Sequence, residues 1–255
     1  MIARALSRQG TIIVIAIVVL AGLAWLWTVS GAGLSSSMGA MERSSAHMGA
    51  DAPGHASLLL LVAMWWVMMI AMMLPSAAPA ILLYDGVRSA SPGAAGIASA
   101  GLFLTGYLLT WLGFSLITTG LQVVGTLTAW IDPMSLAAGT ARAHGILLLV
   151  VGIYQLTPIK DACLTQCRAP AAFLSRYWRP GHAGALRLGV LHGAYCVGCC
   201  WMLMMLLFVG GIMNMAWVAG LAVLVAAEKL LPFGKWIARG SGAAMVAWAG
   251  AILLS

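Results

Sequence analysis

Long apolar segments alternate with short polar ones along most of the chain. About seven of them are close to the length of roughly 20 residues that a helix needs to cross a bilayer. Their approximate limits are 11–29, 57–83, 95–120, 138–157, 186–208, 213–230 and 236–254. The segment 121–137 is shorter and contains Asp132-Pro133, so we expect an interfacial stretch there. The pattern predicts an all-α fold, a polytopic transmembrane helical bundle of about seven helices.

The composition agrees with a membrane protein and argues against two classes of partner. The chain has 255 residues, of which 62% are hydrophobic and 7% are charged, and its mean hydropathy is +1.01. Soluble domains carry about 25% charged residues. The net charge of +7 fits loops beside an anionic lipid leaflet better than it fits nucleic-acid binding. Because the chain has no P-loop and no dinucleotide fingerprint, we expect no nucleotide partner either.

The placement of basic residues predicts the orientation of the chain. If the N-terminus lies inside, only Arg43 and Arg142 of the 13 Lys and Arg residues lie outside. This excess of inner basic residues follows the positive-inside rule and places the C-terminus outside. The first apolar segment follows Arg4 and Arg8, but it is long for a signal peptide, so we expect it to be a retained helix. The predicted location is a bacterial inner membrane, crossed several times.

We divide the chain near residue 56. Residues 1–56 are expected to form an N-terminal membrane helix and an outer loop, and residues 57–255 a helical membrane domain. The outer loop contains several sulfur and nitrogen donors, namely Met38, Met41, His47, Met48 and His55. It resembles loops that capture extracytoplasmic copper, but its Gly, Ser and Ala content equally fits a plain flexible loop.

The strongest chemical signal is a cluster of soft ligands inside an apolar segment. Its members are His192, Cys196, Cys199 and Cys200. At about 100° per residue they fall within an arc of about 100° on one helical face. Thiolate and imidazole groups suit Cu(I) and Zn(II), and thiolates particularly suit Cu(I). Two alternatives remain open, because cysteines also pack as small hydrophobes and the vicinal pair Cys199-Cys200 is a candidate for redox chemistry.

Further candidate ligands lie at the expected inner surface. Cys163 and Cys167 have i,i+4 spacing and follow Pro158, which should kink or end the preceding helix. They would form a second ligand set or an exit point toward a cytosolic chaperone, or else an inert juxtamembrane pair. Glu228 closes the sixth segment, where it would either face the bundle as a ligand or proton acceptor, or pair with Lys229.

A methionine stripe adds a third set of soft donors. Met64, Met68 and Met72 lie within about 80° on one face of the second segment. Thioethers bind Cu(I) without carrying a charge into the membrane. Methionine is also a common apolar filler, so the stripe has a simple packing explanation.

Several of these motifs occur together in one known family. They are Met72-Met73-Leu74-Pro75, the run Tyr154-Gln155-Leu156-Thr157-Pro158-Ile159-Lys160 with Cys163 and Cys167, the segment Cys196-Val197-Gly198-Cys199-Cys200-Trp201, and Glu228-Lys229. In combination they resemble a bacterial family of predicted metal-binding integral membrane proteins, which is defined by a domain of unknown function. The resemblance covers about residues 57–235 and implies a helical membrane bundle that binds a metal. It implies no particular reaction.

The sequence therefore favours a membrane protein that handles a soft transition metal, with copper favoured over zinc. Uptake, delivery or sensing of Cu(I) fits the ligand types, and a non-enzymatic role is preferred. Expected partners are the lipid bilayer, a cytosolic or periplasmic metal chaperone, and other membrane subunits. The alternatives are a membrane metalloenzyme or thiol oxidoreductase that uses the same Cys/His cluster, and an accessory subunit of a membrane complex.

Overall fold

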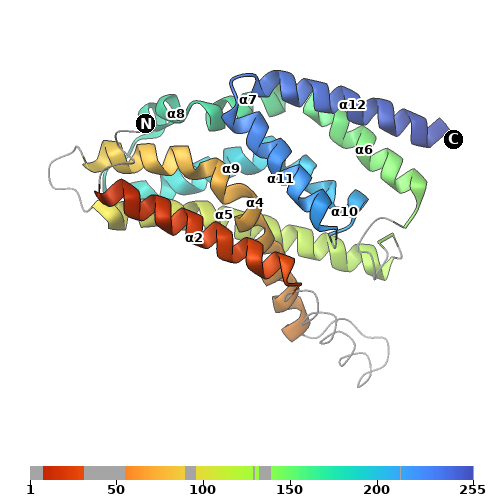
Figure 1. Cartoon of the computed structure of the whole chain (residues 1–255), viewed down its shortest axis with the longest axis horizontal. Coiled ribbons are helices and arrows are strands. Elements are labelled where there is room, and N and C mark those ends of the chain that lie inside the picture. Colours follow the sequence, from red (N-terminus) through yellow and green to blue (C-terminus); the bar gives the residue numbers. More distant parts are fainter. Residues whose placement is uncertain are drawn as a thin grey trace.

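The computed structural model describes residues 8–31, 55–89, 96–128, 130–131, 139–212 and 214–254, which form α-helices joined by short connections (Figure 1). The helices are α2 (Arg8–Val29), α4 (His55–Ser89), α5 (Gly96–Leu127), α6 (Ala141–Gln155), α7 (Pro158–Arg168), α8 (Pro170–Tyr177), α9 (Gly181–Met205), α10 (Leu207–Gly210), α11 (Met215–Leu230) and α12 (Gly234–Leu254). The described part of the chain is therefore all-helical, as predicted. The Met/His loop, with Met38, Met41, His47 and Met48, lies outside the described residues, as does the His55 side chain.

Each predicted apolar segment coincides with a helix, but the helices differ in length. Five of them are long and apolar enough to cross a membrane, namely α2, α4, α5, α9 with α10, and α12. The bent pair α6 and α7 would make a sixth span, whereas α11 has only 16 residues. The number of spans and their orientation stay predictions.

Two boundaries show how local chemistry shapes the helices. The stretch 121–137 was expected to be interfacial, and its first part, as far as Leu127, continues α5. The hydroxyls of Thr126 and Thr128 donate to backbone carbonyls one turn earlier, which satisfies acceptors near the helix end. The predicted break at Pro158 is confirmed: α6 ends at Gln155, and α7 begins at Pro158 with a bend of 63°.

Helix α9 lies at the centre of the bundle and packs closely on α5. A Cβ added at Gly189 would come within 2.0 Å of the Phe103 carbonyl oxygen, and one at Gly106 within 2.3 Å of the Leu186 carbonyl oxygen. Small residues at these positions let the two backbones approach as helices do in membranes. Gly193 packs in the same way on Thr110, whose hydroxyl donates to the Val190 carbonyl at 3.3 Å. This contact sets the distance between the α5 and α9 side chains.

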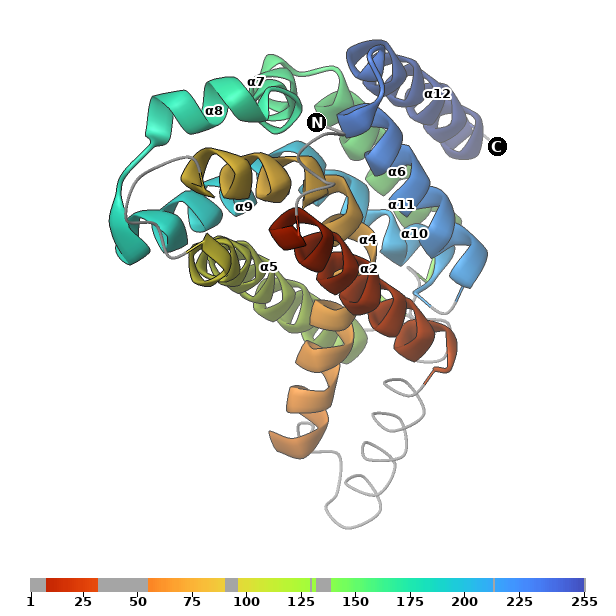
Figure 2. The ribbon, with the colours of Figure 1, turned by 60° about the vertical axis from the view of Figure 1, so that its left-hand side comes forward.

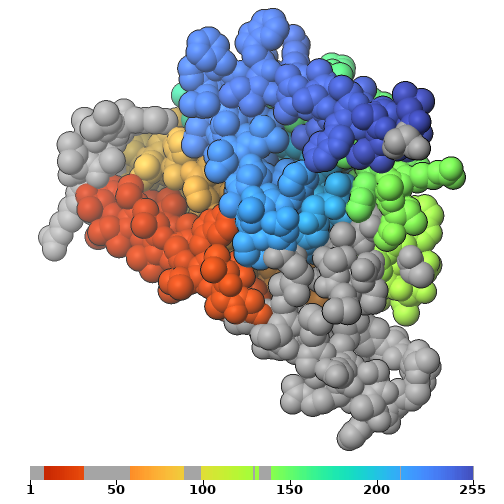
Figure 3. Space-filling model, turned by 45° about the vertical axis from the view of Figure 1, so that its right-hand side comes forward, coloured from red at the N-terminus to blue at the C-terminus, as the bar shows by residue number. Residues whose placement is uncertain are grey.

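The remaining helices surround this central pair. Helix α2 lies along α4, α6 packs on α12, and α7 crosses α9 (Figures 1 and 2). Figure 2 also shows that α4 changes direction along its length, in keeping with Pro75 and Pro79 inside it. Figure 3 shows α2 at the surface, where Val18 and Leu26 are 63% and 68% exposed. An exposed apolar face of this kind fits contact with lipid.

Candidate metal centre

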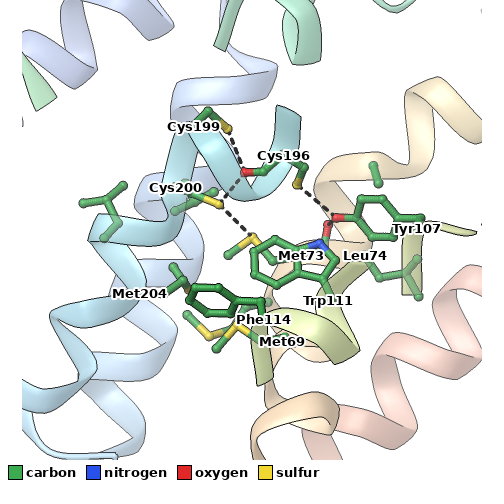
Figure 4. Close-up of a cluster of buried hydrophobic side chains, with 14 of the residues drawn as sticks. Met69, Met73, Leu74, Tyr107, Trp111, Phe114, Cys196, Cys199, Cys200 and Met204 are labelled. Carbon is green, nitrogen blue, oxygen red and sulfur yellow. Dashed lines mark hydrogen bonds between the residues drawn. The ribbon is translucent and has the colours of Figure 1, made fainter. Parts of the chain in front are cut away.

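The three cysteines of α9 are buried in the middle of the bundle. Cys196, Cys199 and Cys200 are each at most 2% exposed (Figure 4). The thiols of Cys199 and Cys200 donate to the Cys196 carbonyl oxygen at 3.1 and 2.9 Å. These short bonds to the backbone of the same helix fix the positions of the two neighbouring side chains. The helix can therefore present sulfur to two different neighbours.

Cys196 and Cys200 face a sulfur-rich space between α4, α5 and α11. The Met73 sulfur lies 3.7 Å from Cys200 Sγ, and the Lys229 ammonium lies 3.0 Å from Cys196 Sγ. The same ammonium is 3.8 Å from both Cys200 Sγ and Met73 Sδ. The Tyr107 hydroxyl approaches Cys196 Sγ at 3.2 Å from the other side (Figure 4). We call Cys196, Cys200 and Met73 the sulfur pocket.

Cys199 contacts a further helix, α7. Its Sγ lies 3.9 Å from Cys167 Sγ. Cys163 packs nearby, because a Cβ added at Gly198 would come within 2.8 Å of its sulfur. The sequence left open whether the cysteines of α7 and α9 lie together, and the structure brings them together. We call Cys167 and Cys199 the lip pair, since Cys167 is only half-buried.

The spacing of these sulfurs can be compared with what an ion requires. Metal–sulfur bonds are about 2.3 Å long, so two sulfurs on one ion lie at most about 4.6 Å apart. The Cys200–Met73 and Cys167–Cys199 separations of 3.7 and 3.9 Å meet this limit. Within the described residues, no group of three or more His, Cys, Asp or Glu side chains stands ready to hold an ion. The donors that the structure does bring within this limit are the two sulfur pairs.

The comparison with known families gives independent evidence. A family model described as PpoB2, copper chaperone, matches residues 62–252, most of the chain. The chain belongs to the PpoB2 copper chaperone family. No curated protein and no solved structure matches the chain. Membership supports a role connected with copper and agrees with the preference for copper over zinc, whereas passage through a membrane and bacterial origin stay predictions.

His192 lies one turn before the sulfurs in this member of the PpoB2 family. Its ring packs among Phe103, Tyr107 and Phe173, with ring centroids 5.8, 6.0 and 5.3 Å away. It is only 3% exposed, and its Nδ1 has no hydrogen-bond partner among the described residues. A buried nitrogen without a partner is costly, so a ligand role for His192 stays a prediction with physical support.

Glu228 is directed away from the sulfur pocket. Its carboxylate pairs with Lys160 at 2.6 Å, not with its neighbour Lys229, and accepts a bond from the Gln155 amide at 2.8 Å. The Gln155 amide also donates to the Ser241 hydroxyl, and its carbonyl oxygen accepts from Lys160. These four side chains, from α6, α7, α11 and α12, form a polar network. A role for Glu228 as a ligand stays a prediction, although its oxygens are already engaged by other groups.

The predicted methionine stripe lies along the interior of α4. Met64, Met68 and Met72 are all buried. Met64 and Met68 line a small pocket between α4, the end of α2 and the start of α11. The other residues of this pocket are Trp27, Thr28, Gly31, Ile212 and Met215. Metal binding by the stripe is untested, and the methionine that touches a cysteine is Met73.

The sequence reasoning missed Met73, Lys229 and Tyr107. Met73 has i,i+4 spacing to Met69, and the two form a second stripe beside Met64, Met68 and Met72. Lys229 follows Val225 by four residues on the buried face of α11, so helical periodicity already placed it inside the bundle. No motif or spacing in the sequence marks Tyr107 as a residue of the site. Its position depends on the close contact between α5 and α9.

Proposed function

We propose that the chain is a membrane-embedded copper chaperone that holds Cu(I) at the sulfur pocket and passes it on through the lip pair. The observation that carries this proposal is that adjacent cysteines of α9 contact sulfurs on two different helices. Cys200 lies 3.7 Å from Met73 on α4, whereas the adjacent Cys199 lies 3.9 Å from Cys167 on α7. Two sulfur sites in series on one helix suit a cargo that is received and released.

The donor types favour Cu(I) as the cargo. Thiolate and thioether ligands favour soft metals such as Cu(I), whereas a site for a harder ion would use carboxylates or carbonyls. The nearest carboxylate, Glu228, is held by Lys160 and Gln155. His192 is a further donor at the edge of the pocket. Zinc is the principal competing metal, because it also accepts thiolates and imidazole.

The methionines suggest the route by which copper arrives. Met64 and Met68 line the small pocket beside α2, and Met72 lies a further turn along α4. Successive members of the stripe are about 6 Å apart along the helix axis. Met73 then adjoins Cys200. In this proposal copper moves along thioethers to the sulfur pocket, then across α9 to the half-buried Cys167, where an acceptor with its own thiols receives it.

The test is copper loading of the full chain in detergent without oxygen. Wild type should retain about one copper per chain, and X-ray absorption should show sulfur neighbours. The Cys196→Ser/Cys200→Ser variant should lose this copper. Ala194→Ser is the matched control, because it places a hydroxyl on the exposed side of the same helix. Equal copper in wild type and the double cysteine variant, or none in either, would contradict the proposal.

The lip pair also fits a second candidate, thiol oxidoreductase activity. Its sulfurs are 3.9 Å apart and need a modest approach to form a disulfide. Thiol counting before and after mild oxidation would reveal this disulfide, and Cys167→Ser should abolish it. A disulfide that cycles with a substrate, in a protein that binds no copper, would favour this candidate over the chaperone.

A further inference from the structure

Lys229 places a positive charge directly against the sulfur pocket. Its ammonium contacts Cys196 Sγ at 3.0 Å and lies 3.8 Å from both Cys200 Sγ and Met73 Sδ. An ammonium has three N–H donors, and here it has three sulfur neighbours. The side chain is 6% exposed, so water does little to screen its charge. A buried ammonium is costly unless nearby groups balance its charge.

The residues that the structure describes supply no carboxylate for this charge. Among the described residues, the two ion pairs join Lys160 to Glu228 and Arg239 to Asp161. Glu228 is adjacent to Lys229 in sequence, but consecutive side chains on a helix point about 100° apart, and its carboxylate is held by Lys160 and Gln155. The groups left to balance Lys229 are the cysteine sulfurs that it touches.

The helix end alone does not explain this arrangement. Lys229 lies in the last turn of α11, where a cation is favoured by the helix dipole. A lysine at such a position commonly extends its long side chain toward water. Lys229 instead turns inward and contacts sulfur, which the dipole does not require. The inward direction therefore points to a role in the pocket.

The charges determine which ion the pocket can hold. Cysteines bind metals as thiolates, so Cys196 and Cys200 contribute two negative charges in the loaded state, and Lys229 contributes one positive charge. Met73 is neutral. A monovalent ion brings the sum to zero, whereas a divalent ion leaves one net positive charge in a buried space. Unbalanced charge in such a place is strongly unfavourable.

We propose that Lys229 is the specificity-determining residue that makes the sulfur pocket prefer a monovalent soft ion over a divalent one. This inference rests on the proposed function, and it adds the means by which Cu(I) is separated from Zn(II). Both metals accept thiolates, so ligand softness alone distinguishes them weakly. The fixed charge of Lys229 supplies the missing discrimination without contacting the ion itself.

The experiment compares Ag(I) with Cd(II), two soft ions that differ in charge. The full chain in detergent is titrated with each metal against a competing chelator, as wild type, Lys229→Gln and Lys229→Arg. Two unit charges a few ångströms apart interact strongly enough that Lys229→Gln should lower the ratio of Ag(I) to Cd(II) affinity on the order of 100-fold. Lys229→Arg keeps the charge and should preserve most of the wild-type ratio.

Three outcomes separate the possibilities. If wild type binds Ag(I) and Lys229→Gln has the same preference as wild type, this inference is wrong while the chaperone proposal stands. If wild type binds neither Ag(I) nor Cu(I), the chaperone proposal is wrong and this inference with it. If Lys229→Gln fails to fold, wild type is compared with dithiothreitol, a dithiol without an ammonium. A preference for Ag(I) no greater than that of dithiothreitol then contradicts the inference.

Discussion

Lys160 and Lys229 are both buried, yet their surroundings have different chemistry. Lys160 lies in the polar network, where Glu228 balances its charge and Gln155 holds both groups. Lys229, next to Glu228 in the sequence, lies against the sulfur pocket, where its close neighbours are Cys196, Cys200 and Met73. In the first region the protein balances its own charge. In the second it leaves a charge for thiolates to balance, and thiolates are also metal ligands.

The largest expected change in stability comes from breaking the ion pair between Lys160 and Glu228. Lys160→Met leaves Glu228 as an uncompensated buried charge, which should lower the free energy of unfolding by about 3–5 kcal/mol. Denaturant unfolding in detergent measures this loss. The control is Lys160→Met/Glu228→Gln, which removes both charges and should recover much of the stability. Equal losses in the two variants would show that the ion pair itself does not matter.

The second effect tests whether the sulfur pocket depends on the close contact between α5 and α9. Gly189→Ala places a Cβ against the Phe103 carbonyl oxygen and should cost about 3 kcal/mol as the helices move apart. Tyr107 would then lose its contact with Cys196, and copper affinity should fall, while the polar network on other helices stays intact. Gly101→Ala is the control, because nothing lies within 4 Å of its added Cβ.

The third effect concerns the thioether. Met73→Leu keeps the volume and apolar character of the side chain but removes a donor, so stability should change by less than about 1.5 kcal/mol. Copper affinity should fall about tenfold, which corresponds to roughly 1.4 kcal/mol. Competition with a Cu(I) chelator measures it. Met204→Leu, a buried methionine later on α9, is the control, and an equal effect in both variants would argue against a special role for Met73.

The smallest expected change in stability is that of removing Lys229, and it contrasts with the large loss expected on removing Lys160. Lys229→Leu removes a buried charge that has no carboxylate partner among the described residues, so the copper-free protein should change in stability by no more than about 1 kcal/mol, or become more stable. Lys160→Leu should be strongly destabilising under the same conditions. Thermal unfolding of the two variants side by side measures the difference. Similar losses of stability in both would show that the two lysines do not differ in how their charges are balanced.

The sequence predicted the features that depend on one helix at a time. The apolar segments, the break at Pro158 and the common buried face of His192, Cys196, Cys199 and Cys200 follow from helical periodicity and from the geometry of proline. The division at residue 56 stays a prediction, because the loop before it lies outside the described residues.

Contacts between helices were beyond reach of the sequence alone. Periodicity places Cys199 on a face, but it does not say that α7 brings Cys167 to within 3.9 Å of it. In the same way, Glu228-Lys229 reads as a local ion pair until the structure shows Lys160 beside Glu228. Both contacts depend on how α7 and α11 pack on α9, and one sequence gives no direct measure of that packing.

If copper is held as proposed, the Tyr107 hydroxyl connects the sulfur pocket to another helix. Its single hydrogen points to the Met73 carbonyl oxygen at 3.1 Å, and Cys196 Sγ lies 3.2 Å away as a second possible acceptor. When Cys196 becomes a thiolate, it competes for that hydrogen with the advantage of a charged acceptor. The Met73 carbonyl then keeps the Ser76 hydroxyl, which donates to it at 2.8 Å, and loses the Tyr107 hydroxyl. Binding of copper as proposed should therefore change the vibrational spectrum of Tyr107 on α5, a helix that supplies no ligand.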